Sequence, residues 1–282
     1  MEEKLNLSTI HKPTWCPGCG NFGIWQALKD TVNKLGVNPN EVVAVYDIGC
    51  NSNMMNWSPV TAFESLHGRT LPVATGIKLA NPKLTVLAIA GDGGCYGEGG
   101  NHLIHAAKRN LDITLLVHDN QIYALTAGQT SPTSEKGFKT KSTPDGSIDE
   151  KLNPLALALA AGATFIARGF AGDLPHLTDL LRQAINHKGF AIVDIMQPCV
   201  SFNPINTFDW YKSRVYKLNE LQYNITDKLS AFAKALEWPA ITKDSKIPIG
   251  ILYQKEAASV NNKDLKTDNN KLNFDGLIQE FL

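Results

Sequence analysis

The sequence predicts an α/β protein with a doubly wound, mostly parallel sheet and helices on both faces. Short apolar runs of strand length alternate with segments whose apolar residues recur at helical spacing, up to about residue 200. Polar or small residues follow these runs directly. The carboxyl edge of such a sheet is where open α/β folds bind ligands, so we expect the functional residues there.

The expected elements follow from apolar spacing and from start and stop residues. Apolar positions 24, 28, 32 and 35 share one helical face, and Gly36 is a natural stop. Asn153-Pro154 fits a helix start by the N-cap and first-turn proline rule, and Gly162 ends that helix. Helices are expected at 24–35, 71–80, 101–109, 154–161 and 173–187. Strands are expected at 42–46, 84–90, 113–117, 163–168 and 190–196.

The pattern weakens beyond residue 202. The elements expected there are an arm or short helix at 210–221, a helix at 225–237, a strand at 247–253 and a solvated polar run at 261–271. The polar stretch 126–152 is long for a structureless connection, so we expect it to be functional or mobile. We predict one domain over residues 1–216 and a C-terminal extension of unknown role over 217–282.

Composition excludes several classes of function. The chain has 282 residues, 43% of them hydrophobic, and Lys+Arg and Asp+Glu both total 27. A balanced charge gives no field that favours nucleic acid or an anionic membrane, so we expect neither as a partner. No apolar run approaches a membrane span, and Met1-Glu2-Glu3-Lys4 lacks the apolar stretch of a signal peptide. We expect a cytoplasmic protein.

The central segment is a strand, a glycine turn, a helix and a second strand, which form a βαβ unit. The turn contains Gly91-Asp92-Gly93-Gly94, and the second strand ends at Asp119-Asn120. Glycines let the backbone approach a diphosphate, and the helix start offers it free N–H groups. Asp92 and Asn120 would lie at neighbouring strand ends, where a carboxylate and an amide oxygen suit Mg²⁺.

A glycine turn after a strand is weak evidence alone, because nicotinamide and flavin sites use similar turns. Here Gly91-Asp92-Gly93 is followed by Asn120, with 27 residues between Asp92 and Asn120. That arrangement resembles the thiamine diphosphate motif, in which Gly-Asp-Gly is followed by Asn after a helix and a strand.

The five cysteines suggest a metal centre. An odd number in a reducing compartment argues against a disulfide framework. Cys16 and Cys19 can bind one centre together, and Cys50 and Cys199 both follow predicted strands. Four thiolates suit a structural Zn²⁺ or an iron–sulfur cluster, and spacing does not separate the two. The alternative is that Cys50 and Cys199 are buried small hydrophobic residues. We expect Cys95 to be a small residue facing the cofactor.

Several motifs in one order carry a resemblance to a known family. They are Trp15-Cys16-Pro17-Gly18-Cys19-Gly20, Ile48-Gly49-Cys50, Leu66-His67-Gly68-Arg69 with Leu71-Pro72-Val73-Ala74-Thr75-Gly76, Gly91-Asp92-Gly93, Asp119-Asn120-Gln121-Ile122-Tyr123, Gly128-Gln129-Thr130-Ser131-Pro132-Thr133 and Gln197-Pro198-Cys199. Over roughly residues 12–216 they closely resemble the beta subunit of 2-oxoacid:ferredoxin oxidoreductases. Residues 217–282 carry no such motif.

The resemblance implies a thiamine diphosphate-binding fold of the diphosphate-domain type, holding thiamine diphosphate, Mg²⁺ and one [4Fe–4S] cluster. The implied cluster ligands are Cys16, Cys19, Cys50 and Cys199. The implied Mg²⁺ ligands are Asp92, Asn120 and the backbone carbonyl of Ile122. The implied cofactor contacts are Ile48, Gly49, Cys50, Asn51, His67, Gly91, Gly93, Gly94, Ala124 and Leu125. His67 is the implied catalytic residue, although a histidine beside Gly68-Arg69 could also be structural; Asp47 is most simply structural.

The implied reaction is the coenzyme A-dependent oxidative decarboxylation of a 2-oxo acid, 2-oxoglutarate or pyruvate, to acyl-CoA and CO₂. The cluster would pass the electrons to ferredoxin. Thiamine diphosphate is normally held between two α/β domains, and this chain has room and motif for only one. We therefore expect an alpha subunit to complete the active site.

Two departures from the family pattern bear on detail. The family often has a second Asp after Gly-Asp-Gly, where this chain has Gly94. It also commonly has Gly after Ile-Tyr and, in some members, Lys before Gly-Gln, where this chain has Ala124 and Ala127. A cation before Gly-Gln could hold a substrate carboxylate, so its absence leaves substrate choice open.

Two other functions fit parts of the sequence. A non-redox thiamine diphosphate-dependent decarboxylase subunit would share Gly91-Asp92-Gly93 and Asn120 but would not need the four cysteines. A zinc-stabilised nucleotide-binding module without catalysis would use the cysteines for a structural ion. Zinc without iron would favour the latter.

Overall fold

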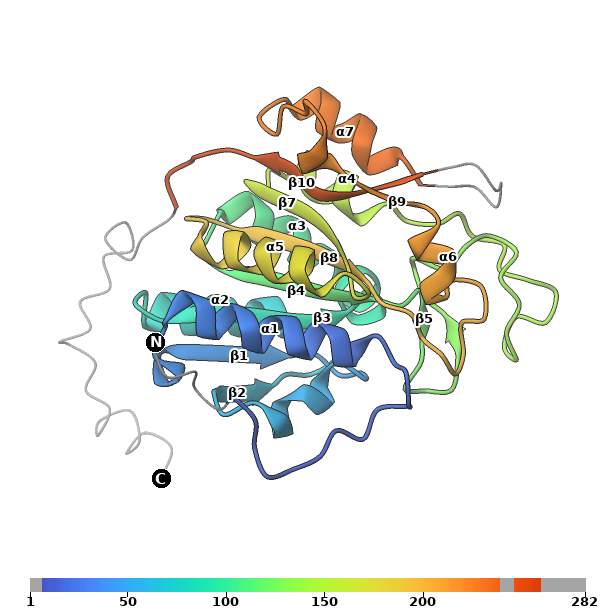
Figure 1. Cartoon of the computed structure of the whole chain (residues 1–282), viewed down its shortest axis with the longest axis horizontal. Coiled ribbons are helices and arrows are strands. Elements are labelled where there is room, and N and C mark those ends of the chain that lie inside the picture. The colour runs from blue at the N-terminus through green and yellow to red at the C-terminus, as the bar shows by residue number, and fades with distance from the viewer. Residues whose placement is uncertain (1–6, 239–245, 260–282) are drawn as a thin grey trace, which may run out of the picture.

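A computed structural model of the chain describes residues 7–238 and 246–259 (Figure 1). Its α-helices are α1 (Asn21–Leu35), α2 (Thr70–Ala80), α3 (Gly100–Arg109), α4 (Pro154–Ala161), α5 (Leu174–Asn186), α6 (Phe208–Lys212) and α7 (Lys228–Leu236). Its strands are β1 (Val42–Tyr46), β2 (Thr61–Glu64), β3 (Thr85–Gly91), β4 (Thr114–Asp119), β5 (Ile122–Tyr123), β6 (Gln129–Thr130), β7 (Phe165–Phe170), β8 (Ala191–Met196), β9 (Val215–Lys217) and β10 (Ile247–Gln254).

The main sheet has the strand order β2-β1-β3-β4-β8-β7-β10-β9. Its pairings are parallel except for β10 against β7. The predicted mostly parallel α/β sheet is therefore confirmed, and every helix and strand expected before residue 200 is present with its ends shifted by three residues or fewer. Gly36 and Gly162 end their helices in the left-handed conformation, as expected.

The segment after residue 216 extends this same sheet. The expected helix at 225–237 and strand at 247–253 are confirmed as α7 and β10. The expected polar run at 261–271 lies outside the described residues. Strand β2 was not expected from the sequence, because an edge strand that faces solvent lacks an apolar run; three of its four residues are exposed.

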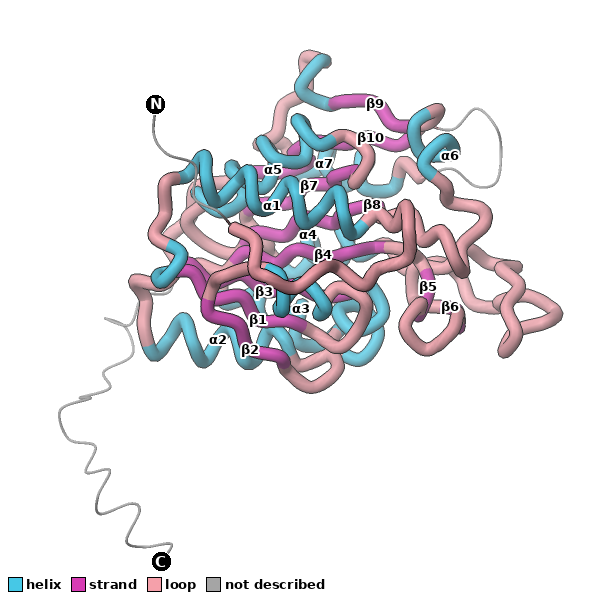
Figure 2. The backbone as a smooth tube through the Cα atoms, turned by 60° about the horizontal axis from the view of Figure 1, so that its bottom comes forward, coloured by secondary structure: helices cyan, strands magenta, loops and turns pink. Residues whose placement is uncertain are grey.

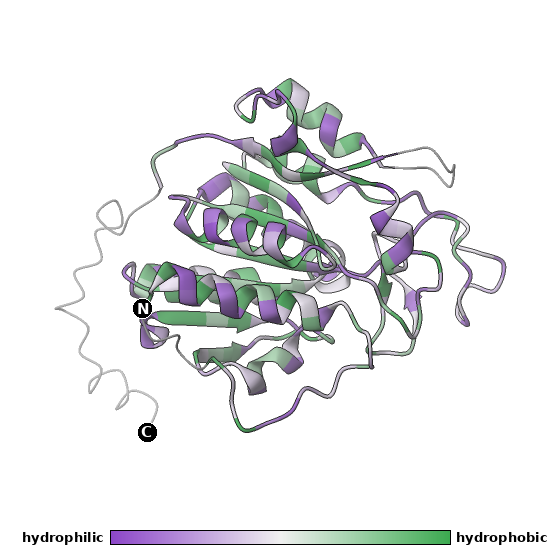
Figure 3. Ribbon diagram, viewed as in Figure 1, coloured by the Kyte–Doolittle hydropathy of each residue, from purple (hydrophilic) through white to green (hydrophobic). Residues whose placement is uncertain are grey.

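Helices cover both faces of the sheet, as Figure 1 shows. The side chains of β1 alternate between two cores. Val43 and Val45 pack in the core that α2, α3, α4 and α7 cover. Val42, Ala44 and Tyr46 pack in the core that α1 and α5 cover. The central strands carry much of the hydrophobic colour in Figure 3, consistent with a sheet buried on both faces.

The parallel strands β1, β3, β4 and β8 end at one edge of the sheet, and long loops gather there together with β5 and β6 (Figure 2). This edge is the one at which the sequence places its polar residues. None of the described helices combines the length and apolar character that a membrane-spanning helix needs.

Candidate active site

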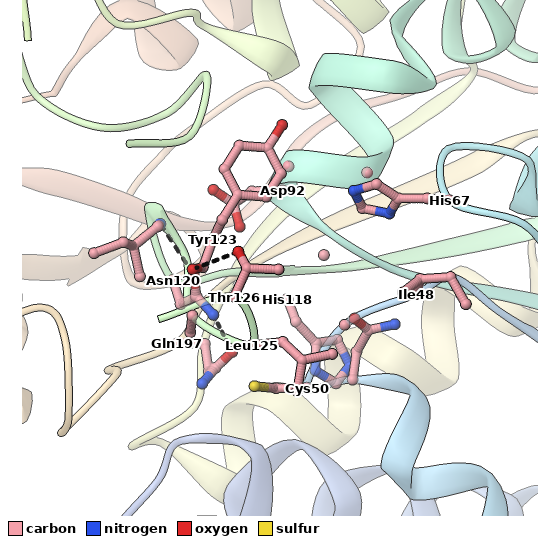
Figure 4. A pocket seen from close by; sticks show the side chains of 17 residues that line it. Ile48, Cys50, His67, Asp92, His118, Asn120, Tyr123, Leu125, Thr126 and Gln197 are labelled. Atoms are coloured by element: carbon pink, nitrogen blue, oxygen red, sulfur yellow. Dashed lines mark hydrogen bonds between the residues drawn. The ribbon is translucent and has the colours of Figure 1, made fainter. Parts of the chain in front are cut away.

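A cleft opens at the carboxyl edge of β1, β3 and β4 (Figure 4). Every residue expected to contact the cofactor lines it: Ile48, Gly49, Cys50, Asn51, His67, Gly91, Gly93, Gly94, Ala124 and Leu125. Figure 4 shows His67 and Ile48 on one side of the cleft and Asn120 on the other. The structure thus brings these residues together, while their contacts with a cofactor stay predictions.

The expected Mg²⁺ ligands Asp92, Asn120 and Ile122 line the same cleft. The Asp92 carboxylate is buried, and its Oδ2 accepts hydrogen bonds from Ser131 Oγ (2.5 Å) and Thr133 Oγ1 (2.6 Å). Both hydroxyls donate to the same carboxylate oxygen. Burial raises the pKa of Asp92 to about 6, although these two hydrogen bonds lower it. A buried carboxylate beside an amide oxygen is a donor set that fits a hard cation such as Mg²⁺.

Further buried carboxylates lie behind Asp92. Thr133 Oγ1 is also 2.8 Å from Asp119 Oδ1, and Tyr96 donates to Asp194 Oδ1 at 2.7 Å. Burial, followed by the charges of Asp194 and Asp92, raises the pKa of Asp119 well above its usual range. Burial raises the pKa of Asp194, whereas the hydrogen bond from Tyr96 and the charges of Arg168 and Lys151 lower it, so two cations of the protein already offset part of this negative charge.

His67 lies between two carboxylates that come from different elements. Its Nδ1 is 3.3 Å from Asp47 Oδ2, just after β1, and its Nε2 is 3.3 Å from Glu98 Oε2. Asp47 is buried, and its Oδ1 accepts the Gly68 N–H at 2.7 Å. Tyr123 donates its hydroxyl to Glu98 at 3.2 Å. Asp47 and Glu98 therefore flank His67, and Glu98 also holds the Tyr123 hydroxyl.

The glycine turn makes room for side chains of the protein itself. A Cβ at Gly93 would lie 2.1 Å from Tyr123 Cε1, and one at Gly94 would lie 1.6 Å from Asp47 Oδ2. The sequence suggested only that these glycines admit a diphosphate. Residues 93–98 form a π-helix that leads into α3, a conformation often found at functional sites.

The four cysteines expected to bind the cluster converge beside the cleft. Cys19 and Cys199 are buried, Cys50 is half-buried and lines the cleft, and Cys16 is exposed. Burial raises the pKa of Cys19 to about 12, and the charges of Cys199, Cys50 and Cys16 add to this rise. Backbone contacts join the segments that carry them: the Gly20 N–H donates to the Pro198 carbonyl at 3.1 Å, and Trp15 Nε1 donates to the Cys50 carbonyl at 2.7 Å. Cys95 lies in the hydrophobic core instead of facing the cofactor, so that expectation is wrong.

Two hydrogen bonds reach the cysteine sulfurs. Gln197 Nε2 donates to Cys19 Sγ at 3.3 Å, and Ser201 Oγ donates to Cys16 Sγ at 3.1 Å. In the described ranges, no three His, Cys, Asp or Glu side chains are spaced to hold a single metal ion. A four-iron cluster binds each thiolate to a separate iron, so it needs wider spacing than tetrahedral zinc does. The assignment of the four cysteines to a cluster rather than to a zinc ion therefore stays a prediction.

Sequence reasoning missed several residues of the site. His118 and Thr126 line the cleft, and Glu98 anchors two of its side chains. His118 Nδ1 is 2.7 Å from Asn21 Oδ1, and burial lowers the pKa of His118 to about 3, so its ring is neutral at pH 7. His118 lies inside a strand and Glu98 inside a helical turn, where no local pattern marks a functional side chain.

Comparisons with known proteins agree with this geometry. Residues 41–195 match the family model of the thiamine pyrophosphate enzyme, C-terminal TPP binding domain. Residues 199–267 match the C-terminal family model of the pyruvate ferredoxin oxidoreductase beta subunit.

Among curated proteins, the chain is similar to 2-oxoacid:ferredoxin oxidoreductase subunit beta of Saccharolobus solfataricus, with 45% identity over 87% of this chain and 83% of the relative. It is also similar to 2-oxoacid:ferredoxin oxidoreductase 1, subunit beta, of Aeropyrum pernix, with 42% identity over 85% and 77%. A solved structure of 2-oxoglutarate:ferredoxin oxidoreductase from Magnetococcus marinus, with 2-oxoglutarate, coenzyme A and succinyl-CoA bound, superimposes with a TM-score of 0.88. It shares 34% identity and covers 97% of this chain and 94% of that one.

Proposed function

The chain belongs to the beta subunits of the 2-oxoacid:ferredoxin oxidoreductases, and from this premise we propose how its residues serve that reaction. It holds thiamine diphosphate and Mg²⁺ in the cleft and one [4Fe–4S] cluster on its four converging cysteines. The observation that carries this proposal is the position of Cys50, which lines the cleft and whose backbone carbonyl accepts a hydrogen bond from Trp15, the neighbour of Cys16 in the chain, at 2.7 Å. One residue thus joins the cofactor site to the electron acceptor.

Different residues of the cleft would bind the metal and the diphosphate. Asp92, Asn120 and the backbone carbonyl of Ile122 would hold Mg²⁺, which would supply positive charge for a diphosphate. Gly93 and Gly94 begin a helical segment, whose first N–H groups would bind the same anion. When bound, thiamine diphosphate would supply the electron sink for decarboxylation. The protein supplies orientation, charge and exclusion of water.

His67 is the catalytic residue of this proposal. Its Nδ1 faces the buried Asp47, and its Nε2 faces Glu98, whose side chain is 44% exposed. The two carboxylates lie on either side of the ring, 3.3 Å from its nitrogens, but the buried atoms His67 Nδ1 and Asp47 Oδ2 do not form a hydrogen bond with each other. The nitrogen on the exposed side, Nε2, is the atom that exchanges a proton with a bound ligand.

Other chains and substrates complete the reaction. Ile48 and Leu125 line the cleft with 39% and 56% of their surface exposed. Exposed apolar side chains at a half-built cofactor site fit an alpha subunit that closes the cleft. Coenzyme A takes the acyl group, and ferredoxin takes the electrons. Because the solved relative contains 2-oxoglutarate, we propose 2-oxoglutarate as the first substrate to test, with pyruvate second. Free thiols and a cluster suit a reducing, cytoplasmic compartment.

The test is anaerobic purification with the co-expressed alpha chain, followed by iron, sulfide and zinc analysis and EPR. About four iron and four sulfide per beta chain are expected, with an EPR signal that appears on adding a 2-oxo acid. Cys199→Ser should lose the cluster, whereas Cys95→Ser, a buried cysteine outside the group, should keep it. Zinc in place of iron would overturn the proposal and favour the zinc-stabilised module, and a cluster that no 2-oxo acid reduces would overturn it in favour of a non-redox function.

A further inference from the structure

Asn203 ties the turn after Cys199 to the loop that carries two of the proposed Mg²⁺ ligands. Its side chain is buried, and its Nδ2 donates to the backbone carbonyl of Asn120 at 3.0 Å. Its Oδ1 accepts the N–H groups of Ile205 (3.2 Å) and Asn206 (3.0 Å), and its own N–H donates to the Cys199 carbonyl at 3.1 Å. One buried amide thus shapes the turn after a cysteine and also contacts the loop of the cleft.

Two further contacts join the same two segments, which we call the Cys199 segment (residues 197–206) and the cleft turn (residues 119–122). The Gln197 N–H donates to the Asp119 carbonyl at 2.9 Å, one residue beyond the last pair of β4 and β8. Cys199 is buried in a small hydrophobic cluster with Ile122 and Phe138. The Cys199 segment therefore meets the cleft turn at its first residue, at Asn120 and at its last residue.

The cleft turn has a backbone conformation that needs such support. Gln121 lies between the two ligands Asn120 and Ile122, and its φ is 61°, in the left-handed region that residues other than glycine rarely adopt. A conformation of this kind persists only where the surrounding structure holds it. Asn203 holds the residue just before Gln121, and Cys199 packs in one cluster with the residue just after it. The Cys199 segment therefore supports the turn that brings both ligands to the cleft.

We propose that Asn203 is a positioning residue for the Mg²⁺ ligands, through which an iron–sulfur cluster on Cys199 strengthens the binding of Mg²⁺ and thiamine diphosphate. This inference rests on the proposed function, because it takes Cys199 as a cluster ligand and Asn120 as a metal ligand. Attachment of Cys199 to iron fixes the Cys199 segment, and the Asn203 amide passes this order to the carbonyl of Asn120. Such coupling is reciprocal, so bound Mg²⁺ and thiamine diphosphate should raise the affinity for the cluster by the same factor.

The first test is calorimetric titration of Mg²⁺ into the anaerobic, cluster-loaded alpha–beta complex at saturating thiamine diphosphate. Asn203→Ala should raise the Kd for Mg²⁺ at least about tenfold, the loss typical of a residue that orients a metal ligand. Asn206→Ala is the matched control and should keep the wild-type Kd. This asparagine is equally buried in the same turn, and among the described contacts it has no hydrogen bond to Asn120.

A second variant, Asn203→Asp, separates the contact with the cleft turn from the shape of the Cys199 segment. An aspartate can still accept the N–H groups of Ile205 and Asn206, but it cannot donate to the Asn120 carbonyl. Its negative charge would by itself favour Mg²⁺, so weaker binding in this variant would report the lost contact. A wild-type Kd in both Asn203 variants would overturn the inference.

The second test measures the coupling itself. Removal of the cluster with ferricyanide and a chelator, followed by removal of the chelator, should raise the Kd for Mg²⁺ of the wild-type complex at least about fivefold. The same treatment should change the Kd of Asn203→Ala little, because the connection is already cut. Equal changes in the two proteins would overturn the role of Asn203. Failure of the proposed function is distinguished by iron analysis before either titration, since the wild-type complex would then hold no iron.

Discussion

The Asp47 carboxylate occupies the space next to the Cα of Gly94 into which any other residue would project its side chain. A Cβ at that position would lie 1.6 Å from Asp47 Oδ2 and 2.6 Å from its Cγ. Asp47 cannot move away easily, because it is buried and its Oδ1 accepts the Gly68 N–H. This chain thus combines Gly94 with a carboxylate from the neighbouring strand end.

Gly94→Ala should therefore destabilise the protein by at least about 2 kcal/mol, because overpacking must displace a buried, hydrogen-bonded carboxylate. Denaturant unfolding of the purified complex or chain measures the difference. Gly100→Ala is the matched control: no atom lies within 4 Å of its Cβ, and alanine favours the helix that begins there. Equal stability of the two variants would contradict the packing of Asp47 against Gly94.

The sequence predicted the framework of the site better than its interior. The carboxyl edge, the strands that end there and the clustering of Cys50, Asp92 and Asn120 follow from apolar runs and from motifs, which are local. The contact between Glu98 and His67 could not be predicted in this way, because the two residues are 31 positions apart and meet only through the positions of their side chains. The prediction that Cys95 faces the cofactor was wrong for a similar reason, because the π-helix turns its side chain into the core.

Mg²⁺ affinity should depend on pH through Asp92. The metal binds the ionised carboxylate, and burial raises the pKa of Asp92 to about 6. Affinity should be level above about pH 6 and fall toward tenfold per pH unit below it. Because the pKa is raised from 3.8, this group also lowers the stability of the metal-free protein as the pH rises from about 4 to about 6.

Calorimetric titration of Mg²⁺, in the presence of thiamine diphosphate and between pH 5 and 8, measures this dependence. Asp92→Asn should remove most of the affinity at every pH. Thr133→Val should instead change the pH at which affinity falls, because the Thr133 hydroxyl lies 2.6 Å from Asp92 Oδ2 and 2.8 Å from Asp119 Oδ1. A pH-independent affinity in the wild type would exclude Asp92 as the titrating ligand.

Glu98 should control activity through position rather than through contact with substrate. It faces His67 Nε2 at 3.3 Å and accepts the Tyr123 hydroxyl at 3.2 Å, so Glu98→Ala releases both side chains from the cleft wall. We expect kcat/KM for the 2-oxo acid to fall at least about tenfold. Glu98→Gln should retain much of the activity, because its amide oxygen can still accept from Tyr123.

Steady-state kinetics with separate kcat and KM values, together with the affinity for thiamine diphosphate, distinguish this role from a loss of folding. Glu64→Ala is the control, an exposed glutamate on the edge strand β2. Wild-type kinetics in Glu98→Ala would show that the contacts with His67 and Tyr123 are incidental.

Gln197 joins the two halves of the proposed site. Its Nε2 donates to Cys19 Sγ at 3.3 Å, and its Oε1 accepts from Asn120 Nδ2 at 3.5 Å. A hydrogen bond to a cluster sulfur stabilises the more negative reduced state, so Gln197→Leu should lower the reduction potential, on the order of tens of millivolts. EPR-monitored redox titration measures this shift.

Gln183→Leu on α5 is the control, because its amide donates only to Asp179 at the surface among the described contacts. A potential that stays the same or rises in Gln197→Leu would mean that Gln197 serves Asn120 alone, and the cluster would then be tuned by Ser201 through its contact with Cys16.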